Sequence, residues 1–261
     1  MKHERALLGA ASVAVFLTLW EGLTRGWWTE HLRVSQIFVS SPSAIAVAFY
    51  RMFFVTGEIW NDLRVSSLEY ATGFFLAVVV GIPLGLAAGW YPRLHYVVEP
   101  FLSALSATPQ VAFLPLLIAW VGIGLWSKVT VIVLLAVLPI TISAQAAVKT
   151  VDAGLLKVAR SFGSSEWQIF RDIIVPSAVP FLLAGLRLAV GRAMIGVVVG
   201  ELYAATAGVG FMIHLAGSSF QTDKVFVGVI VIAASGLVLI EVLRRIERRV
   251  EAWRPRVGAA A

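Results

Sequence analysis

Hydrophobic and polar positions divide this chain into long uncharged runs separated by short charged stretches. The runs, together with one mainly apolar stretch that carries three charges (180–203), cover residues 6–20, 70–92, 100–127, 129–148, 180–203 and 225–243. About 20 apolar residues are needed for a helix to cross the hydrocarbon core of a bilayer. The pattern therefore predicts an all-α membrane protein with about six transmembrane helices. The first run, after Lys2 and Arg5, is also compatible with a signal peptide, but no small-residue cleavage site follows it.

Proline and glycine modify this outline at two places. Pro109 and Pro115 interrupt the third run, so a broken or kinked helix is expected there after a short polar turn at 91–99. Gly81, Gly85 and Gly89 form two overlapping GxxxG pairs in the second run. Such pairs let another helix approach closely in lipid, although a helix that is merely loosened by glycine is an equal alternative.

The segments between the first two runs and before the last run have a different pattern. Ser41-Pro42 is typical of a helix start, and the apolar stripe Ile45, Phe49, Met52 and Phe53 follows at helical spacing. Because Arg51 and Glu58 interrupt the apolar character, we expect an amphipathic helix at the outer interface. Residues 204–223 are predicted to form an outer loop with a short helix.

Composition narrows the class of protein. Only 14% of the residues are charged and 59% are hydrophobic, with a mean hydropathy of +0.87, which argues against both an ordinary soluble enzyme and a disordered chain. With six spans, thirteen Lys and Arg fall on the side of the termini and six on the other. The positive-inside rule therefore places both termini in the cytoplasm. The basic tail 249–261 is then a topology determinant rather than a nucleic-acid-binding segment.

Motifs that carry enzymatic chemistry are missing from the sequence. It contains no cysteine, no phosphate-binding G-x-x-x-x-G-K-[ST] and no G-x-S-x-G, and its four histidines are scattered. The chain is therefore predicted to be neither an enzyme nor a metal protein. Any energy source must be a gradient or another chain.

The loop between the fourth and fifth spans is the most informative segment. It is predicted to form two short amphipathic helices around a Gly-Ser turn, with Asp152 capping the first helix and Ser164 or Ser165 the second. Gly163 suits a left-handed position at the end of the first helix. A structured loop with an exposed apolar face indicates docking to another protein.

This loop resembles the EAA loop of ABC importer permeases, E-A-A-x3-G-x9-I-x-L-P. Four positions match (Ala159, Gly163, Ile173, Pro176), while Lys157 replaces the Glu, Val158 the first Ala and Val175 the Leu. The resemblance implies an ATPase-coupling role for the following loop residues: Lys157, Ala159, Gly163, Ser164, Trp167, Phe170, Ile173 and Pro176.

The resemblance extends over most of the chain and is to the nitrate, sulfonate and taurine branch of these permeases. It is carried by Ala107-Thr108-Pro109, Trp120-Val121-Gly122-Ile123-Gly124, Gly185-Leu186-Arg187, Glu201-Leu202 and Gly208-Val209-Gly210-Phe211. It implies the type I ABC importer permease fold: a transmembrane core at 62–248 with the EAA-like loop at 150–176, preceded at 1–61 by the first transmembrane helix and the outer amphipathic helix.

Membership would also imply partners and a location. These are a second copy of the chain, two cytoplasmic P-loop ATPases that hold ATP and Mg, an extracytoplasmic solute-binding protein and the bacterial inner membrane. The chain itself would hold no cofactor. Transport would proceed by alternating access.

Charges within the fifth span remain to be explained. Arg187 either snorkels to the cytoplasmic face or has a more specific role. Arg192 and Glu201 are nine residues apart and lie on opposite faces of a helix, so each must face another helix, a second subunit or a watery path. Together with Pro109 and Gln110 at the predicted break, they are candidates for a translocation path.

The arginines favour an anionic solute such as a sulfonate, taurine or nitrate, although small heterocyclic precursors remain possible. The alternative function is an ion-coupled secondary transporter. Such a transporter needs intramembrane carboxylates, and Glu201 is the only clear one in the core spans.

Overall fold

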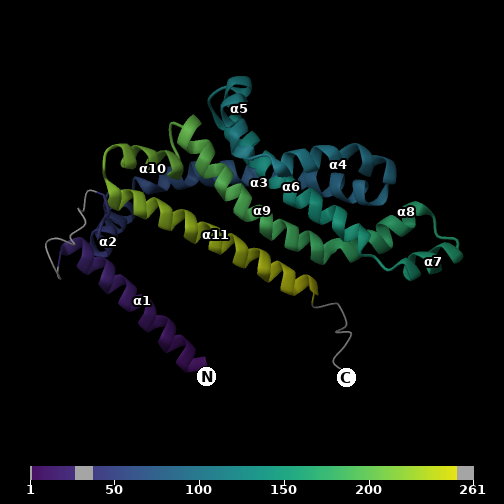
Figure 1. Ribbon diagram of the computed structural model, residues 1–261, viewed down its shortest axis with the longest axis horizontal. Coiled ribbons are helices and arrows are strands. Elements are labelled where there is room, and N and C mark those ends of the chain that lie inside the picture. Colours follow the sequence, from purple (N-terminus) through teal and green to yellow (C-terminus); the bar gives the residue numbers. More distant parts are fainter. Residues whose placement is uncertain (1, 27–37, 252–261) are drawn as a thin grey trace. The chain divides into compact units, whose positions relative to one another are not determined.

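The computed structural model describes residues 2–26 and 38–251, and the regular structure of this part is helical (Figure 1). Trp27, Trp28 and most of the basic tail (252–261) lie outside the described residues. The helices are α1 (Lys2–Arg25), α2 (Pro42–Tyr50), α3 (Ile59–Trp90), α4 (Pro92–Ala107), α5 (Leu114–Val121), α6 (Leu125–Lys149), α7 (Ala153–Ser161), α8 (Glu166–Ile169), α9 (Val175–Ala204), α10 (Val209–Ser218) and α11 (Thr222–Glu251).

Five of these segments are long and apolar enough to cross a membrane, and a sixth candidate is the bent pair α4–α5. The five are Leu7–Arg25, Ile59–Trp90, Leu125–Lys149, Glu166–Ala204 and Thr222–Arg249. In the pair, Pro92–Ala107 and Gln110–Val121 meet at 94°. The chain forms two compact units, Met1–Ser66 with Thr206–Ala233, and Ser67–Ala205 with Ala234–Ala261.

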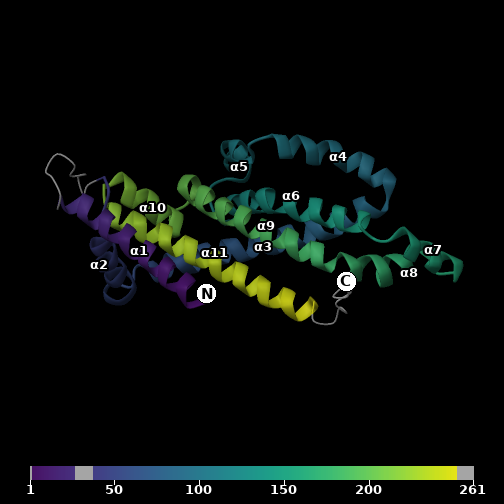
Figure 2. The same ribbon diagram turned by 60° about the horizontal axis from the view of Figure 1, so that its bottom comes forward.

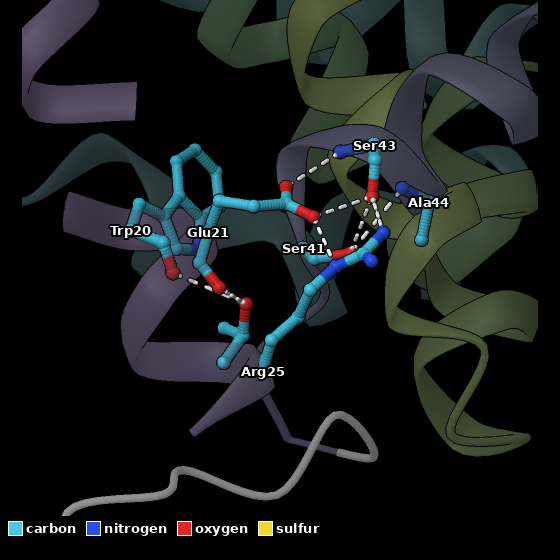
Figure 3. A network of polar contacts seen from close by, with 7 residues as sticks. Trp20, Glu21, Arg25, Ser41, Ser43 and Ala44 are labelled. Carbon is cyan, nitrogen blue, oxygen red and sulfur yellow. Dashed lines mark hydrogen bonds and ion pairs between the residues drawn. The ribbon is translucent and has the colours of Figure 1, made fainter. Parts of the chain in front are cut away.

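In the first unit, a polar network joins the end of α1 to the start of α2 (Figure 3). The Glu21 carboxylate accepts hydrogen bonds from the backbone N–H of Ser43 at 3.0 Å and from its hydroxyl at 2.7 Å, and it pairs with Arg25. Arg25 in turn donates to the Ser43 hydroxyl at 2.8 Å. Because Ser43 lies in the first turn of α2, the carboxylate stabilises N–H groups that the helix leaves unpaired.

The predicted start of α2 is confirmed. The Ser41 hydroxyl accepts a hydrogen bond from Ala44 N, and Pro42 occupies the first turn. The predicted stripe packs into the core of this unit: Ile45 and Met52 are buried, and Phe49 and Phe53 cover them. The same core contains Val209 of α10, the short helix expected within 204–223.

The second unit is built around α6, which most other helices of the unit contact. Where α6 meets α3, glycines of α3 lie against residues 59 positions later in the chain: Gly73 on Ile132, Gly81 on Ile140, Gly85 on Ala144 and Gly89 on Val148. A constant offset means that the two helices run parallel. The close-approach interpretation of the GxxxG pairs is therefore correct.

On α9 the order is reversed. Gly185 lies against Ser143, Gly196 against Ile132 and Gly200 against Lys128, so α9 runs antiparallel to α6. Both views show α6 and α9 side by side along their length (Figures 1 and 2). Fourteen residues of α6 are buried, as befits a helix packed closely between neighbours.

The parallel packing of α3 and α6 indicates whether the bent pair α4–α5 is a broken span or a re-entrant loop. The chain leaves α3 at one end of the unit and must enter α6 at the opposite end. Residues 91–124 therefore run back along the full length of these helices. The pair α4–α5 is therefore a broken span rather than a re-entrant loop, which brings the candidate crossings in the described part of the chain to six.

The structure corrects three boundaries. The predicted polar turn at 91–99 is wrong, because α4 begins at Pro92 and the turn is confined to Tyr91. The second span begins as early as Ile59, and the last helix continues into the basic tail as far as Glu251. In each case charged residues mark where a helix leaves the apolar layer and not where its hydrogen bonding ends.

Candidate functional site

Helix α7 and its turn have the local structure that the sequence predicts. The Asp152 carboxylate accepts from Gly154 N at 2.7 Å and caps α7. Gly163 adopts the left-handed φ of +78°, and the N–H groups of Gly163 and Ser164 donate to the carbonyls of Arg160 and Ala159 at 3.0 and 3.1 Å. Glycine is the residue that takes this conformation without steric cost.

The second half of the loop differs from the prediction. Ser165 and Gln168 form a reciprocal capping box at 3.3 and 2.8 Å, which starts α8. However, α8 does not end as a separate short helix, because the π-helical turn Phe170–Ile174 carries it directly into α9. The apolar stretch from Glu166 to Ala204 is thus one continuous helical segment of 39 residues. Pro176 lies in the first turn of α9, where its missing N–H is tolerated.

The two faces of the loop have different environments. Ile169 and Ile174 are fully buried. Ile174 belongs to a core formed with the ends of α3 and α6, and Leu156 and Phe170 pack against this core. Sequence reasoning missed Ile169, although it falls four residues before the matched Ile173. Ile173, Ala159, Ser164 and Pro176 are half-buried, whereas Lys157 and Gly163 are exposed.

Large apolar side chains on the other face point away from the unit. Phe162 is 85% exposed and Trp167 is 66% exposed, with Leu155 and Val158 also exposed. Arg160 and Glu166 form an ion pair at 3.2 Å across the turn, an interaction that sequence spacing alone did not single out. Figure 1 shows α7 and α8 together at the end of the unit where α6 ends.

The predicted break at Pro109 is confirmed, and the broken helix borders a cavity of about 550 Å³. Helix α4 ends at Ala107, and side chains replace two of the backbone donors that its last turn loses. The Thr108 hydroxyl donates to Ala104 O at 2.8 Å, and Gln110 Nε2 donates to Leu105 O at 3.3 Å. Pro115, by contrast, lies in the first turn of α5 and causes no second break.

Three of the four predicted path residues meet at this cavity, namely Pro109, Gln110 and Arg192. Residues of α6 complete much of its wall. The structure does not bring Glu201 together with them. That side chain is 0% exposed, and its carboxyl group lies beside that of Glu69 of α3.

Glu69 forms an ion pair with Lys128 at the start of α6, and Lys128 is 5% exposed. The helix registers explain this cluster, because Lys128 follows Glu69 by the same 59 residues that separate the glycine contacts of α3 and α6. Lys128 also packs on Gly200, next to Glu201. Arg187, five residues before Arg192, pairs with Glu247 of α11. Among the described residues, no group of three His, Cys, Asp or Glu side chains is placed to hold a metal ion.

Comparison with known proteins identifies the family. Residues 81–252 match the model of the family described as binding-protein-dependent transport system inner membrane component. The taurine transport system permease protein TauC of Escherichia coli (strain K12) is 34% identical over 96% of this chain and 90% of its own length. A putative aliphatic sulfonates transport permease protein, SsuC of Bacillus subtilis (strain 168), is 35% identical over 85% of this chain and 80% of its own.

The fold has a counterpart among solved structures. A chain of the MetNI methionine ABC transporter in an inward-facing conformation superimposes with a TM-score of 0.56 at 20% identity, covering 76% of this chain and 97% of its own. This similarity shows the fold alone, which is the type I importer permease fold. The secondary-transporter alternative is not favoured by any of these relatives. The chain belongs to the binding-protein-dependent transport system inner membrane component family and is a multi-pass, membrane-spanning permease subunit of an ABC importer.

Proposed function

We propose that this permease imports a small organic anion, a sulfonate such as taurine or a similar oxyanion such as nitrate, by alternating access. It works as one of two copies in the membrane, with two cytoplasmic P-loop ATPases and an extracytoplasmic solute-binding protein. The solute class is suggested by the transport systems to which the two relatives belong, those for taurine and for aliphatic sulfonates. ATP and Mg belong to the ATPases, because this sequence has no phosphate-binding loop.

The observation that carries the coupling proposal is the exposure of Phe162 and Trp167 on the loop 152–176. Lipid is an unsuitable cover for them, since Lys157, Arg160 and Glu166 are exposed on the same loop. Aromatic side chains that are exposed within a polar rim are typical anchors for a protein partner. The partner is the ATPase, and the docking surface includes Lys157, Ala159, Gly163, Ser164, Trp167, Phe170, Ile173 and Pro176.

The continuous helix from Glu166 to Ala204 supplies the mechanical connection. Arg192 lies 26 residues after Glu166, about 39 Å along the axis at 1.5 Å per residue. A small rotation of the docked loop therefore becomes a displacement of α9 at the cavity. Pro109, Gln110 and Arg192 form part of the translocation path, whereas Glu201 stabilises helix packing.

Orientation follows from the basic residues. The loop 152–176 and the α11 end lie on the side that carries most of the Lys and Arg, so this side and both termini are cytoplasmic. The chain then consists of three parts: the first transmembrane helix with the outer amphipathic helix (1–61), the permease core (62–248) and the basic cytoplasmic tail (249–261).

The test uses substitutions in the loop. Gly163→Val disfavours the left-handed turn by about 1–2 kcal/mol, and no atom lies within 4 Å of the added Cβ, so the effect is on the backbone rather than a clash. Gly9→Val is the matched control, since Gly9 is helical and equally open. The first variant should insert and dimerise normally but lose ATPase association, or hydrolyse ATP without transport.

Phe162→Asn provides a second test that leaves the turn intact. It should reduce retention of the ATPase in a pull-down and reduce uptake into proteoliposomes that contain the binding protein. Phe220→Asn is its control, because Phe220 is 63% exposed in the loop before α11, on the opposite side of the membrane in the proposed topology. Full uptake and unchanged ATPase retention by both loop variants would remove this loop from the mechanism.

A further inference from the structure

The cavity beside the helix break lies near the middle of the membrane-spanning layer. Its wall includes Leu135, Leu138, Pro139 and Ile142 of α6. Leu138 is the fourteenth of the 25 residues of this helix, so it lies about 18 Å from either end at 1.5 Å per residue. The cavity of about 550 Å³ is therefore remote from both aqueous surfaces along the helix axis.

Arg192 brings a positive charge to this depth. It is an exposed residue of α9 that lines the cavity. Twelve residues, or about 18 Å, separate it from the end of α9 at Ala204, so its side chain does not reach that end. Among the side chains that the structure describes, none forms an ion pair or hydrogen bond with it. Arginine at mid-depth costs about 2.5–3.5 kcal/mol even on the most permissive scale.

The described side chains leave no carboxylate free to pair with this arginine at the same depth. Glu241 of α11 lies near that level, because Glu247 of the same helix pairs with Arg187, but Glu241 is paired with Arg244 and Arg245. Acidic residues are absent from 70–98, 100–151, 173–200 and 224–240. Glu69 and Glu201 are buried beside Lys128 near the start of α6, away from Arg192. Glu99 of α4 is near His95 at 3.7 Å and accepts from Ser103 at 3.2 Å.

The contrast with Arg187 is informative, since that arginine of the same helix has its own carboxylate, Glu247. Among the described side chains Arg192 has no counter-charge of its own, so an anion from outside the permease polypeptide can supply it.

We infer that Arg192 is an anion-binding residue of the translocation path and that the solute carries a sulfonate or a comparable singly charged oxyanion. This inference rests on the proposed import function and deepens it. The planar guanidinium offers parallel N–H donors that match two oxygens of such a group. Ser106 and Gln110 line the same cavity and can supply further donors, because the Ser106 hydroxyl forms no hydrogen bond within the described chain and Gln110 Nε2 uses only one hydrogen for Leu105.

The experiment measures binding of ethanesulfonate to the full-length permease with its ATPase, in nanodiscs and without the binding protein, by isothermal titration calorimetry. The wild type should bind ethanesulfonate saturably and should not bind ethyl methyl sulfone, an uncharged analogue. Arg192→Met should weaken ethanesulfonate binding by at least tenfold. Arg192→Lys should bind with intermediate affinity, because it retains the positive charge and loses the parallel N–H donors of the guanidinium. Arg187→Lys, the same change in a paired arginine, should bind like the wild type.

Measurements of uptake and of complex assembly distinguish failure of the Arg192 inference from failure of the proposed import function. Arg192→Lys that elutes as the intact complex but binds ethanesulfonate as well as the wild type would overturn the inference, as would equal binding of the sulfone. ATP-driven uptake by the wild type would still support the proposed import function in that case. Absence of any ATP-dependent uptake by the wild-type complex with its binding protein would instead overturn the proposed function.

Discussion

Alanine at Gly85 should destabilise the permease more than its single methyl group suggests. The Cβ of an alanine there would collide with the carbonyl oxygen of Thr141 and would lie 2.6 Å from the Cβ of Ala144. Carbon atoms in contact are normally about 3.5–4.0 Å apart. The nearest obstacle is backbone and the next is a Cβ, so no rotamer change relieves the contact, and α3 and α6 must separate locally.

The magnitude follows from two opposing terms. Overpacking of this kind costs about 1–3 kcal/mol, and a backbone obstacle places it in the upper part of that range. Replacing a helical glycine by alanine contributes about 0.5–1 kcal/mol in the other direction. The net loss is about 1–2 kcal/mol, which corresponds to a decrease in Tm of about 2–8 °C for a chain of roughly this size.

The assay is thermal unfolding of the purified full-length permease in one detergent, with Gly236→Ala as the matched control. Gly236 lies in α11, and no atom is found within 4 Å of its added Cβ. The control should therefore retain or raise its Tm while Gly85→Ala lowers it. Equal Tm values for the two variants would refute the close packing of α3 on α6 in this register, and with it the argument that α4–α5 is a full crossing.

Three further predictions concern the buried cluster and the energy source. Lys128→Met leaves the Glu69 carboxylate buried without its cation, beside Glu201, and should cost about 3–5 kcal/mol, seen as a lower Tm and yield. Lys149→Met is the control, because Lys149 is exposed, and it should behave like the wild type. An unchanged Tm for Lys128→Met would contradict the buried ion pair between Lys128 and Glu69. Glu201→Leu should impair assembly on size-exclusion chromatography, whereas Glu201→Gln should be milder because it retains hydrogen bonding; normal assembly and uptake by the leucine variant would show that this carboxyl is dispensable. The purified chain alone should not hydrolyse ATP in a phosphate-release assay, and hydrolysis without an ATPase subunit would be incompatible with the permease assignment.

Some sequence-based predictions failed because polarity was used to locate helix ends. The charges between Tyr91 and Glu99 suggested a turn, yet α4 begins at Pro92. The segment from Glu166 to Ile174 was expected to be a separate short helix, yet it continues into α9. A helix satisfies its own backbone hydrogen bonds in water as well as in lipid, so leaving the apolar layer is no reason for it to stop.

Features that depend on the backbone of a few neighbouring residues were determined by the sequence alone. The cap at Ser41, the cap at Asp152, the left-handed turn at Gly163 and the break at Pro109 all occur where residue chemistry placed them. Each rests on a local property, such as a side-chain acceptor, a missing Cβ or a missing N–H. The family resemblance rested on the same kind of local spacing.

The different roles of Arg192 and Glu201 were decided only by the tertiary structure. Both are charged residues of α9, and the sequence could place them only on opposite faces. The packing of α6 between α3 and α9 buries Glu201 beside Glu69 and leaves Arg192 facing a cavity. That packing depends on glycines whose contacts lie 59 residues away on α3 and 42 to 72 residues away on α9. Register between distant segments is set by mutual close packing, which no local pattern contains.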